Sequence, residues 1–167
     1  MTGLPLLFLL LHIGGAVIAF GPTFAFSIIG GMGGREPMHN NFALRLTDRI
    51  ERGIVLPLAI VQAITGIGII WTLPLDLTKA LWLDLAIVLY VIALGIAFLN
   101  QLPVIEKLIE VTKNPPPAPP AGTPAPAGPP PHVAAMVRRV QMGGMALGLL
   151  VVVIIILMVL GTNGFFA

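Results

Sequence analysis

The chain has 167 residues, of which 57% are hydrophobic and only 10% are charged. A soluble domain carries about 25% charged residues, so this composition excludes an ordinary soluble protein. Nine Lys/Arg against seven Asp/Glu leave a net charge of only +2, which does not indicate nucleic-acid binding, and the lack of cysteine excludes disulfides and thiolate chemistry.

Four apolar stretches dominate the sequence, and each is near or above the ~20 residues needed to cross the hydrocarbon core of a bilayer. They cover residues 4–29, 54–71, 80–102 and 133–160. We therefore predict an all-α, membrane-spanning four-helix bundle whose solvent is the lipid bilayer. No Lys or Arg precedes the first stretch, which is also long for the apolar part of a signal peptide, so we expect no cleavage there.

The basic residues predict the orientation of these helices. Of the nine, only Lys79 lies between the second and third helices, and the others lie in the first and third connections or at the start of the fourth helix. Positively charged connections face the cytoplasm, so both termini should lie outside. Trp71 and Trp82 flank the short outer turn, where an aromatic belt is expected.

The first connection contains a run of glycines and an amphipathic segment. We expect the glycines at residues 30–34 to end the first helix, and residues 39–53 to form a short helix with apolar residues at helical spacing. The glycines lack a following Gly-Lys-Ser/Thr, so they are not a phosphate-binding loop.

The third connection begins with a proline and ends in a proline-rich segment. We expect the third helix to continue past the membrane, with a kink or break at Pro103, and residues 104–113 suit a helix at the membrane interface. Residues 114–131 are nearly all Pro, Ala and Gly, which predicts a polyproline-type spacer, with a PxxP ligand at residues 116–119 as the alternative. We accordingly divide the chain into a three-helix core (1–113), a cytoplasmic Pro/Ala-rich tether (114–132) and a fourth helix (133–167), which need not sit beside the third.

Polar side chains on three helices fall at one calculated depth. At 1.5 Å per residue, His12 lies about 12 Å, Gln62 about 13 Å and Tyr90 about 15 Å from the outer surface. Thr65 and Asp84 should lie one to two turns further out. Because lipid offers no hydrogen-bonding partner, these side chains should point into the bundle.

Small residues mark the faces on which membrane helices pack closely, and they share helical faces with these polar residues. The fourth helix has its own small face with Gln141 and a Gly-x-x-x-Gly, suited to another helix of this chain or of a second copy. The predicted packing residues are Gly15, Ala19, Gly66, Ala93, Gly144 and Gly148.

Two interpretations of the polar level remain open. The residues either hydrogen-bond the helices to one another, or His12, Gln62 and Tyr90 bind a cofactor, with His12 as a metal or haem ligand. His39 and His132 fall at the cytoplasmic edge, too far away to be a second axial ligand. The sequence contains no His-Glu-x-x-His motif and no nucleophile–base–acid set, so we do not predict an enzyme.

Short motifs in the first three helices, about two thirds of the chain, resemble a known family. They are Leu11-His12-Ile13-Gly14, Pro57, Gln62, Thr65-Gly66, Trp82-Leu83, Leu89-Tyr90-Val91 and Leu102-Pro103-Val104. The sequence resembles the bacterial predicted integral membrane proteins grouped as domain-of-unknown-function family 2269. The resemblance implies a small helical bundle in the bacterial inner membrane and implies no activity. The long tether is unlike the usual short connection.

The leading functional hypothesis is a non-enzymatic membrane component that acts by helix packing with itself or within a larger complex. The first alternative is a haem-handling or redox membrane protein that uses His12 as a ligand. The second is a small transporter or channel, for which Asp84 near the outer rim is the candidate relay.

Overall fold

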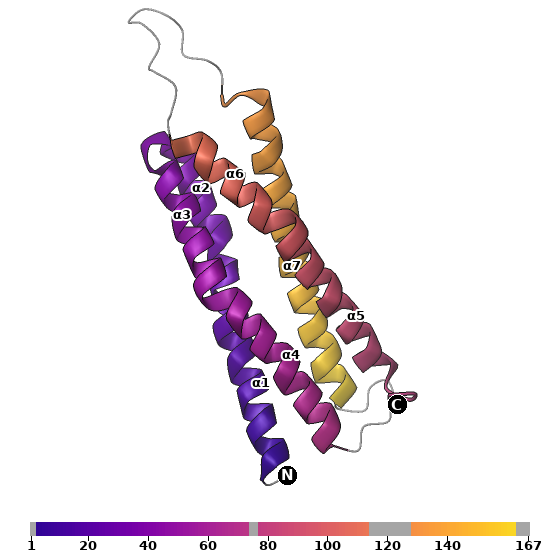
Figure 1. Ribbon diagram of the computed structural model, residues 1–167. Coiled ribbons are helices and arrows are strands. Elements are labelled where there is room, and N and C mark those ends of the chain that lie inside the picture. The colour runs from indigo at the N-terminus through magenta and orange to yellow at the C-terminus, as the bar shows by residue number, and fades with distance from the viewer. Residues whose placement is uncertain (1–2, 74–76, 114–127, 163–167) are drawn as a thin grey trace, which may run out of the picture.

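The computed structural model describes residues 3–73, 77–113 and 128–162, and these residues form four long helices (Figure 1). Each long helix has 31 to 33 residues and is apolar enough to cross a membrane. This confirms the prediction of an all-α chain with four candidate membrane spans. The long helices are Leu4–Arg35, Asn40–Thr72, Leu81–Lys113 and Pro131–Gly161.

Three of the long helices change helix type along their length. The first consists of α1 (Leu4–Phe20), the 3-10 turn η1 (Gly21–Ala25) and α2 (Phe26–Arg35). After η2 (Pro37–His39), the second consists of α3 (Asn40–Ile50), the π segment η3 (Glu51–Val55) and α4 (Leu56–Thr72). The third consists of α5 (Leu81–Ile96), the π segment η4 (Ala97–Gln101) and α6 (Leu102–Lys113). The fourth is a single α-helix, α7 (Pro131–Thr162).

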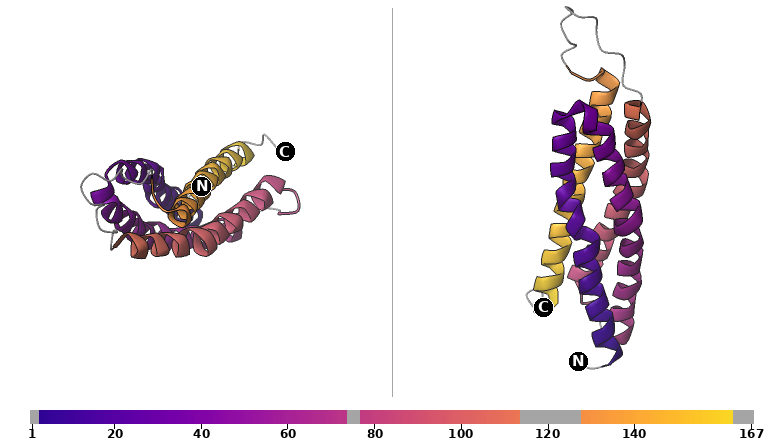
Figure 2. Two further views of the ribbon diagram at one scale, coloured as in Figure 1. Left: turned by 90° about the horizontal axis from the view of Figure 1, so that it is seen from above. Right: turned by 90° about the vertical axis from the view of Figure 1, so that its left-hand side faces the viewer.

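The four long helices pair into two antiparallel hairpins. In the first hairpin, residues 4–72, α1 packs on α4 and α2 on α3. In the second hairpin, residues 81–113 and 131–162, α7 packs along α5 and α6. At one end α6 also packs on α3, which joins the two hairpins (Figures 1 and 2).

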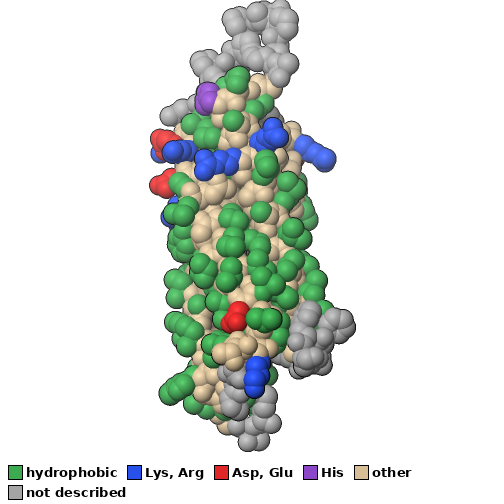
Figure 3. All heavy atoms as spheres, turned by 90° about the vertical axis from the view of Figure 1, so that its right-hand side faces the viewer, with side chains coloured by type: hydrophobic (Ala, Val, Ile, Leu, Met, Phe, Trp, Pro, Cys, Tyr) green, Lys and Arg blue, Asp and Glu red, His purple; other side chains and the backbone are tan. Residues whose placement is uncertain are grey.

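Charged residues divide the bundle along its length. Lys and Arg gather near the end formed by the α2–α3 turn, the end of α6 and the start of α7, above a broad hydrophobic band (Figure 3). We call this the basic end. The first residues of α1, the end of α4 and the start of α5 lie at the opposite end (Figure 1).

The glycines at residues 30–34 lie in the last turns of the first helix. α2 includes all of them and ends at Arg35, one residue after the last glycine, and α3 follows after η2 and runs on into α4. A Cβ atom at Gly33 would lie 2.8 Å from the Cβ of Ala43, so glycine allows α2 and α3 to approach this closely. Gly33 therefore also serves helix packing, whereas a Cβ at Gly30, Gly31 or Gly34 would meet nothing within 4 Å.

Prolines explain the two π segments. Pro57 and Pro103 lack an N–H, and their rings clash with the carbonyl four residues earlier in an α-helix. In each case the preceding residue bonds five residues back: the Leu56 N–H donates to the Glu51 carbonyl, and the Leu102 N–H to the Ala97 carbonyl. Because the wider turn accommodates the ring, the helix runs on through Pro103 and the predicted break does not occur.

The segment 104–113 continues the third helix instead of forming a separate interfacial helix. In α6, Val104 and Leu108 are buried with Val133 of α7, and Leu44 of α3 packs against this cluster. Neighbouring helices thus cover the apolar face that we had assigned to the membrane interface. The fourth helix lies beside the third despite the long connection, of which residues 114–127 fall outside the described part of the chain.

Candidate functional site

A seam of small residues closes the first hairpin between α1 and α4. A Cβ atom at Gly68 would lie 2.6 Å from the ring of Phe8, and one at Gly15 would lie 3.1 Å from Oε1 of Gln62. Ala19 and Ala59 are 0% and 3% exposed. We call this contact the α1–α4 seam; it holds the two backbones close enough for short polar side chains to reach across.

His12 lies in the α1–α4 seam and bonds to the opposite helix. Its Nδ1 lies 3.1 Å from Oγ1 of Thr65, and its Cε1 lies 3.2 Å from the position of a Cβ at Gly66. The depth calculation had aligned His12 with Gln62 and placed Thr65 further out. The structure instead pairs His12 with Thr65, which lies about one turn, or about 5 Å, further from the basic end than Gln62.

The contact between His12 and Thr65 is compatible with either tautomer of the imidazole. The Thr65 hydroxyl has the Val61 carbonyl at 2.9 Å and the Gln62 carbonyl at 3.1 Å within reach. If it donates to one of these, it accepts from Nδ1 of His12 and Nε2 keeps its lone pair; if it donates to Nδ1, the ring hydrogen is on Nε2.

Gln62 is buried in the same seam without a matching partner. The residue is 7% exposed, and its Oε1 accepts no hydrogen bond from the described residues. The missing side chain at Gly15 leaves room for this amide. The structure therefore brings His12 and Gln62 into one interface, with only His12 bonded across it through its side chain.

Tyr90 reaches α4 from the second hairpin. Its hydroxyl donates to the carbonyl of Ala59 at 2.5 Å, one turn before Gln62 along α4. No hydrogen bond within the described chain joins it to His12 or Gln62. The side chains predicted to share one depth thus contact α4 at different turns. Tyr90 joins the two hairpins and does not complete a three-residue site with His12 and Gln62.

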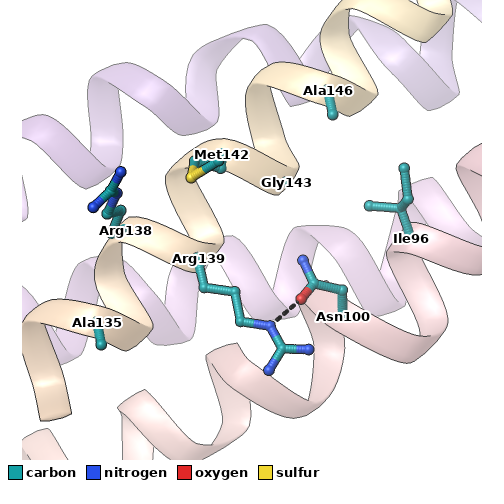
Figure 4. Close-up of a pocket in the computed structure, with 8 residues that line it drawn as sticks. All are labelled: Ile96, Asn100, Ala135, Arg138, Arg139, Met142, Gly143 and Ala146. Carbon is teal, nitrogen blue, oxygen red and sulfur yellow. Dashed lines mark hydrogen bonds between the residues drawn. The ribbon is translucent and has the colours of Figure 1, made fainter.

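A second polar contact lies nearer the basic end and was not foreseen. Gln101 of η4 donates from Nε2 to the Val140 carbonyl of α7 at 3.0 Å, and Arg139 donates from Nε to Oδ1 of Asn100 (Figure 4). A Cβ atom at Gly143 would lie 2.6 Å from Nε2 of Gln101. As with Gln62, the Oε1 of Gln101 is buried without a partner among the described residues.

The structure places the predicted packing residues in different surroundings. Gly15, Ala19 and Gly66 lie in the α1–α4 seam, and Ala93 is half-buried on α5. Gly144 is exposed, and a Cβ at Gly148 would meet nothing within 4 Å. Within this chain, α7 meets its neighbour through Gly143 and Gly161, where a Cβ at Gly161 would collide with the indole of Trp82.

Glu51 is a buried carboxylate that our sequence argument also missed. It is 8% exposed in η3, at the first position of the π segment. Its spacing from Val55, Ala59 and Gln62, which are also buried, follows one face of a helix. Extending the apolar pattern of α4 backwards through Gly53 would have placed this carboxylate on the buried face.

The remaining histidines do not come near His12. His39 lies at the basic end, with Nδ1 3.0 Å from the carboxylate of Glu36, and His132 is exposed in the first turn of α7. Among the described residues no three His, Asp or Glu side chains group as a metal site.

Comparison with known proteins places the chain in one family. A family model described as predicted integral membrane protein (DUF2269) matches residues 6–161. No match was found among curated proteins or solved structures. The matched range includes the fourth helix, which the resemblance noted from sequence motifs did not reach.

Proposed function

Since the chain belongs to this family of predicted integral membrane proteins, DUF2269, we propose that it is a non-enzymatic component of the bacterial inner membrane that acts by helix packing with a second copy or a larger complex. The main support is the use of polar groups inside the spans. His12, Tyr90 and Gln101 each bond to a neighbouring helix of the same chain. These groups are arranged as contacts between helices rather than around a common pocket.

One face of α7 supports packing with a second copy, because this chain leaves most of it exposed. Gln141 and Gly144 are exposed, and Gly148 has open space where a side chain would begin. These three residues share a helical face, and glycines four apart let a second helix approach closely while a glutamine bonds across. Gly144 borders the contact with η4, since a Cβ there would lie 3.7 Å from Nε2 of Gln101, whereas a Cβ at Gly148 meets nothing within 4 Å. The part of the face around Gly148 is therefore the part where a second copy could pack.

The test of self-association substitutes two glycines at which a new side chain would start in open space. Gly148→Ile fills the proposed contact, whereas Gly14→Ile adds the same bulk on α1, where a Cβ also meets nothing within 4 Å. In detergent, sedimentation velocity should show the Gly148→Ile variant as monomer at concentrations at which wild type and Gly14→Ile associate. Equal association of all three proteins would contradict packing through this face.

We also propose that the basic end faces the cytoplasm. The described helices place the start of α1 and the end of α7 at the opposite end, so both would lie outside (Figure 1). Reporter fusions after residue 112 should then report the cytoplasm, and fusions at the C-terminus the outside. The reverse pattern would invert this orientation.

Haem or redox handling remains the alternative, and one observation favours it. In the tautomer in which Nδ1 donates to Thr65, Nε2 of His12 keeps a lone pair with which a histidine can ligate haem iron or a metal. A Soret band in gently purified protein that disappears in His12→Gln would support this alternative over helix packing alone. A flat spectrum of the wild-type protein would remove it.

A further inference from the structure

An open groove runs between η4 and α7 on the outside of the second hairpin. It has a volume of about 420 Å³. Its polar lining is Asn100, Arg138 and Arg139, and its apolar lining includes Ile96, Met142 and Ala146 (Figure 4). The groove thus has one charged part and one apolar part, and its arginines lie in the first third of α7, towards the basic end.

The charges of the groove are not neutralised by the protein. Within the described chain no carboxylate lies within the 4 Å of an ion pair from Arg138 or Arg139, whereas Arg52 nearby is paired with both Asp48 and Glu106. Arg139 uses Nε to hold Asn100, which leaves its terminal nitrogens free to donate. Arg138 extends from the same turn of α7 and points away from Asn100 (Figure 4). The two guanidinium groups therefore offer several unused donors and two uncompensated positive charges.

The apolar part of the groove leads away from these charges into the membrane. Ile96 lies one turn beyond Asn100 on α5, and Ala146 lies about 10 Å along α7 from Arg139 at 1.5 Å per residue. Met142 lies between them, and it is exposed. A ligand that fits both parts must carry a negative head and an apolar chain.

We propose that this groove binds an anionic phospholipid, with its phosphate at Arg138, Arg139 and Asn100 and one acyl chain along Ile96, Met142 and Ala146. Arginine is suited to phosphate because its planar fork donates two parallel hydrogen bonds. Basic pockets between membrane helices on the cytoplasmic side are recognised sites for anionic headgroups. The Asn100 amide adds a neutral donor, since its Nδ2 makes no hydrogen bond within the described chain. This site goes beyond helix packing and does not depend on it.

The test compares two pairs of arginines at the same end of the bundle. Arg138→Gln/Arg139→Gln removes the charges of the groove, and Arg45→Gln/Arg49→Gln removes two exposed charges of α3 that lie outside it. Each intact protein in neutral detergent is titrated with phosphatidylglycerol and with phosphatidylcholine of the same chains, and lipid-bound protein is counted by native mass spectrometry. Circular dichroism confirms that each variant keeps its helix content.

We expect wild type and the Arg45/Arg49 pair to prefer phosphatidylglycerol, and the Arg138/Arg139 pair to bind it about thirtyfold more weakly, from about fivefold for each of the two lost charges. Ala146→Trp should also weaken the lipid without changing any charge, because the indole would fill the path of the acyl chain. Undiminished binding by the groove pair, or an equal loss in both pairs, would overturn the site. Displacement of the lipid by millimolar inorganic phosphate would show a phosphate site rather than a lipid site.

Discussion

The two hairpins bury a similar kind of polar contact at different depths. In the first hairpin, Gln62 faces Gly15 in the middle of the α1–α4 seam, with His12 and Thr65 bonded one turn away. In the second hairpin, Gln101 faces Gly143 near the basic end, beside the half-buried Asn100 and the exposed Arg139. Both glutamines have an Oε1 without a partner among the described residues.

This difference in depth separates structural from interfacial roles. The contact in the first hairpin lies among apolar side chains, where its polar atoms can only serve the helices around them or a buried ligand. The contact in the second hairpin opens onto the groove that reaches the charged end of the bundle. A glycine opposite a buried glutamine thus marks close packing in both hairpins, while the surroundings decide what else the site can bind.

The largest predicted effect is the loss of the glycine in the second hairpin. In Gly143→Leu the new side chain would start 2.6 Å from Nε2 of Gln101 and 2.7 Å from Nδ2 of Asn100, so both amides must leave their positions and Gln101 loses its bond to α7. We expect a loss of about 2–3 kcal/mol in the free energy of unfolding, measured by denaturation in mixed micelles. Gly95→Leu on α5, where a Cβ meets nothing within 4 Å, is the matched control. Equal losses in both variants would mean that Gly143 has no special role in packing.

The next effect concerns the hydrogen bond across the first hairpin. His12→Ala should cost about 1–2 kcal/mol and Thr65→Val about 1 kcal/mol, the upper range for such bonds between membrane helices. His12→Gln should recover part of the loss, because glutamine can also donate to Oγ1 of Thr65. The double variant His12→Ala/Thr65→Val should lose less than the sum of the single variants. Strict additivity in this cycle would show that the 3.1 Å contact contributes nothing.

The first hairpin was more predictable from sequence than the second for a physical reason. In α1 the only strongly polar side chain is His12, so Gly15 and Ala19, which follow it on the same helical face, define the buried face. In α4, Ala59 and Gly66 do the same for Gln62. In α7 two neighbouring glycines, Gly143 and Gly144, differ by about 100° around the helix. Gly144 has its partner Gly148 one turn away, which made that face the more visible pattern in sequence.

In the structure, α7 contacts η4 through Gly143 rather than through Gly144 and Gly148. Gly143 and Gly161 are 18 residues apart, which is five turns at 3.6 residues per turn, so both face α5 and η4. A spacing this long is not a recognisable motif, and the outer half of α7 has no polar residue to indicate its buried side. The continuous helix through Pro103 was not predicted, because a proline can break a helix or be accommodated by a π turn, and the residue type alone does not decide between these outcomes.

A smaller effect is expected when the buried amide of the second hairpin is removed. Gln101→Leu loses the hydrogen bond to Val140, worth about 0.6 kcal/mol for an average membrane contact. It also removes the buried Oε1 that has no partner, and these two contributions oppose one another. Denaturation should therefore show a net loss below about 0.5 kcal/mol. A loss comparable to that of Gly143→Leu would mean that the amide, rather than close helix approach, holds this hairpin together.

The smallest predicted effect is in the first hairpin, where Gln62→Leu should leave stability unchanged or raise it slightly. The side chain of Gln62 makes no hydrogen bond to the described residues, so its replacement by an apolar group of similar size removes only an unsatisfied polar group. The same denaturation assay measures the change, with Gln101→Leu as the comparison. A loss above about 1 kcal/mol would be the size of a real membrane hydrogen bond, and would show that Oε1 has a partner in the folded protein. Because His12 lies in the same seam, such a partner would point to a bound molecule shared by both side chains, which the absorbance spectrum of the wild type can detect independently.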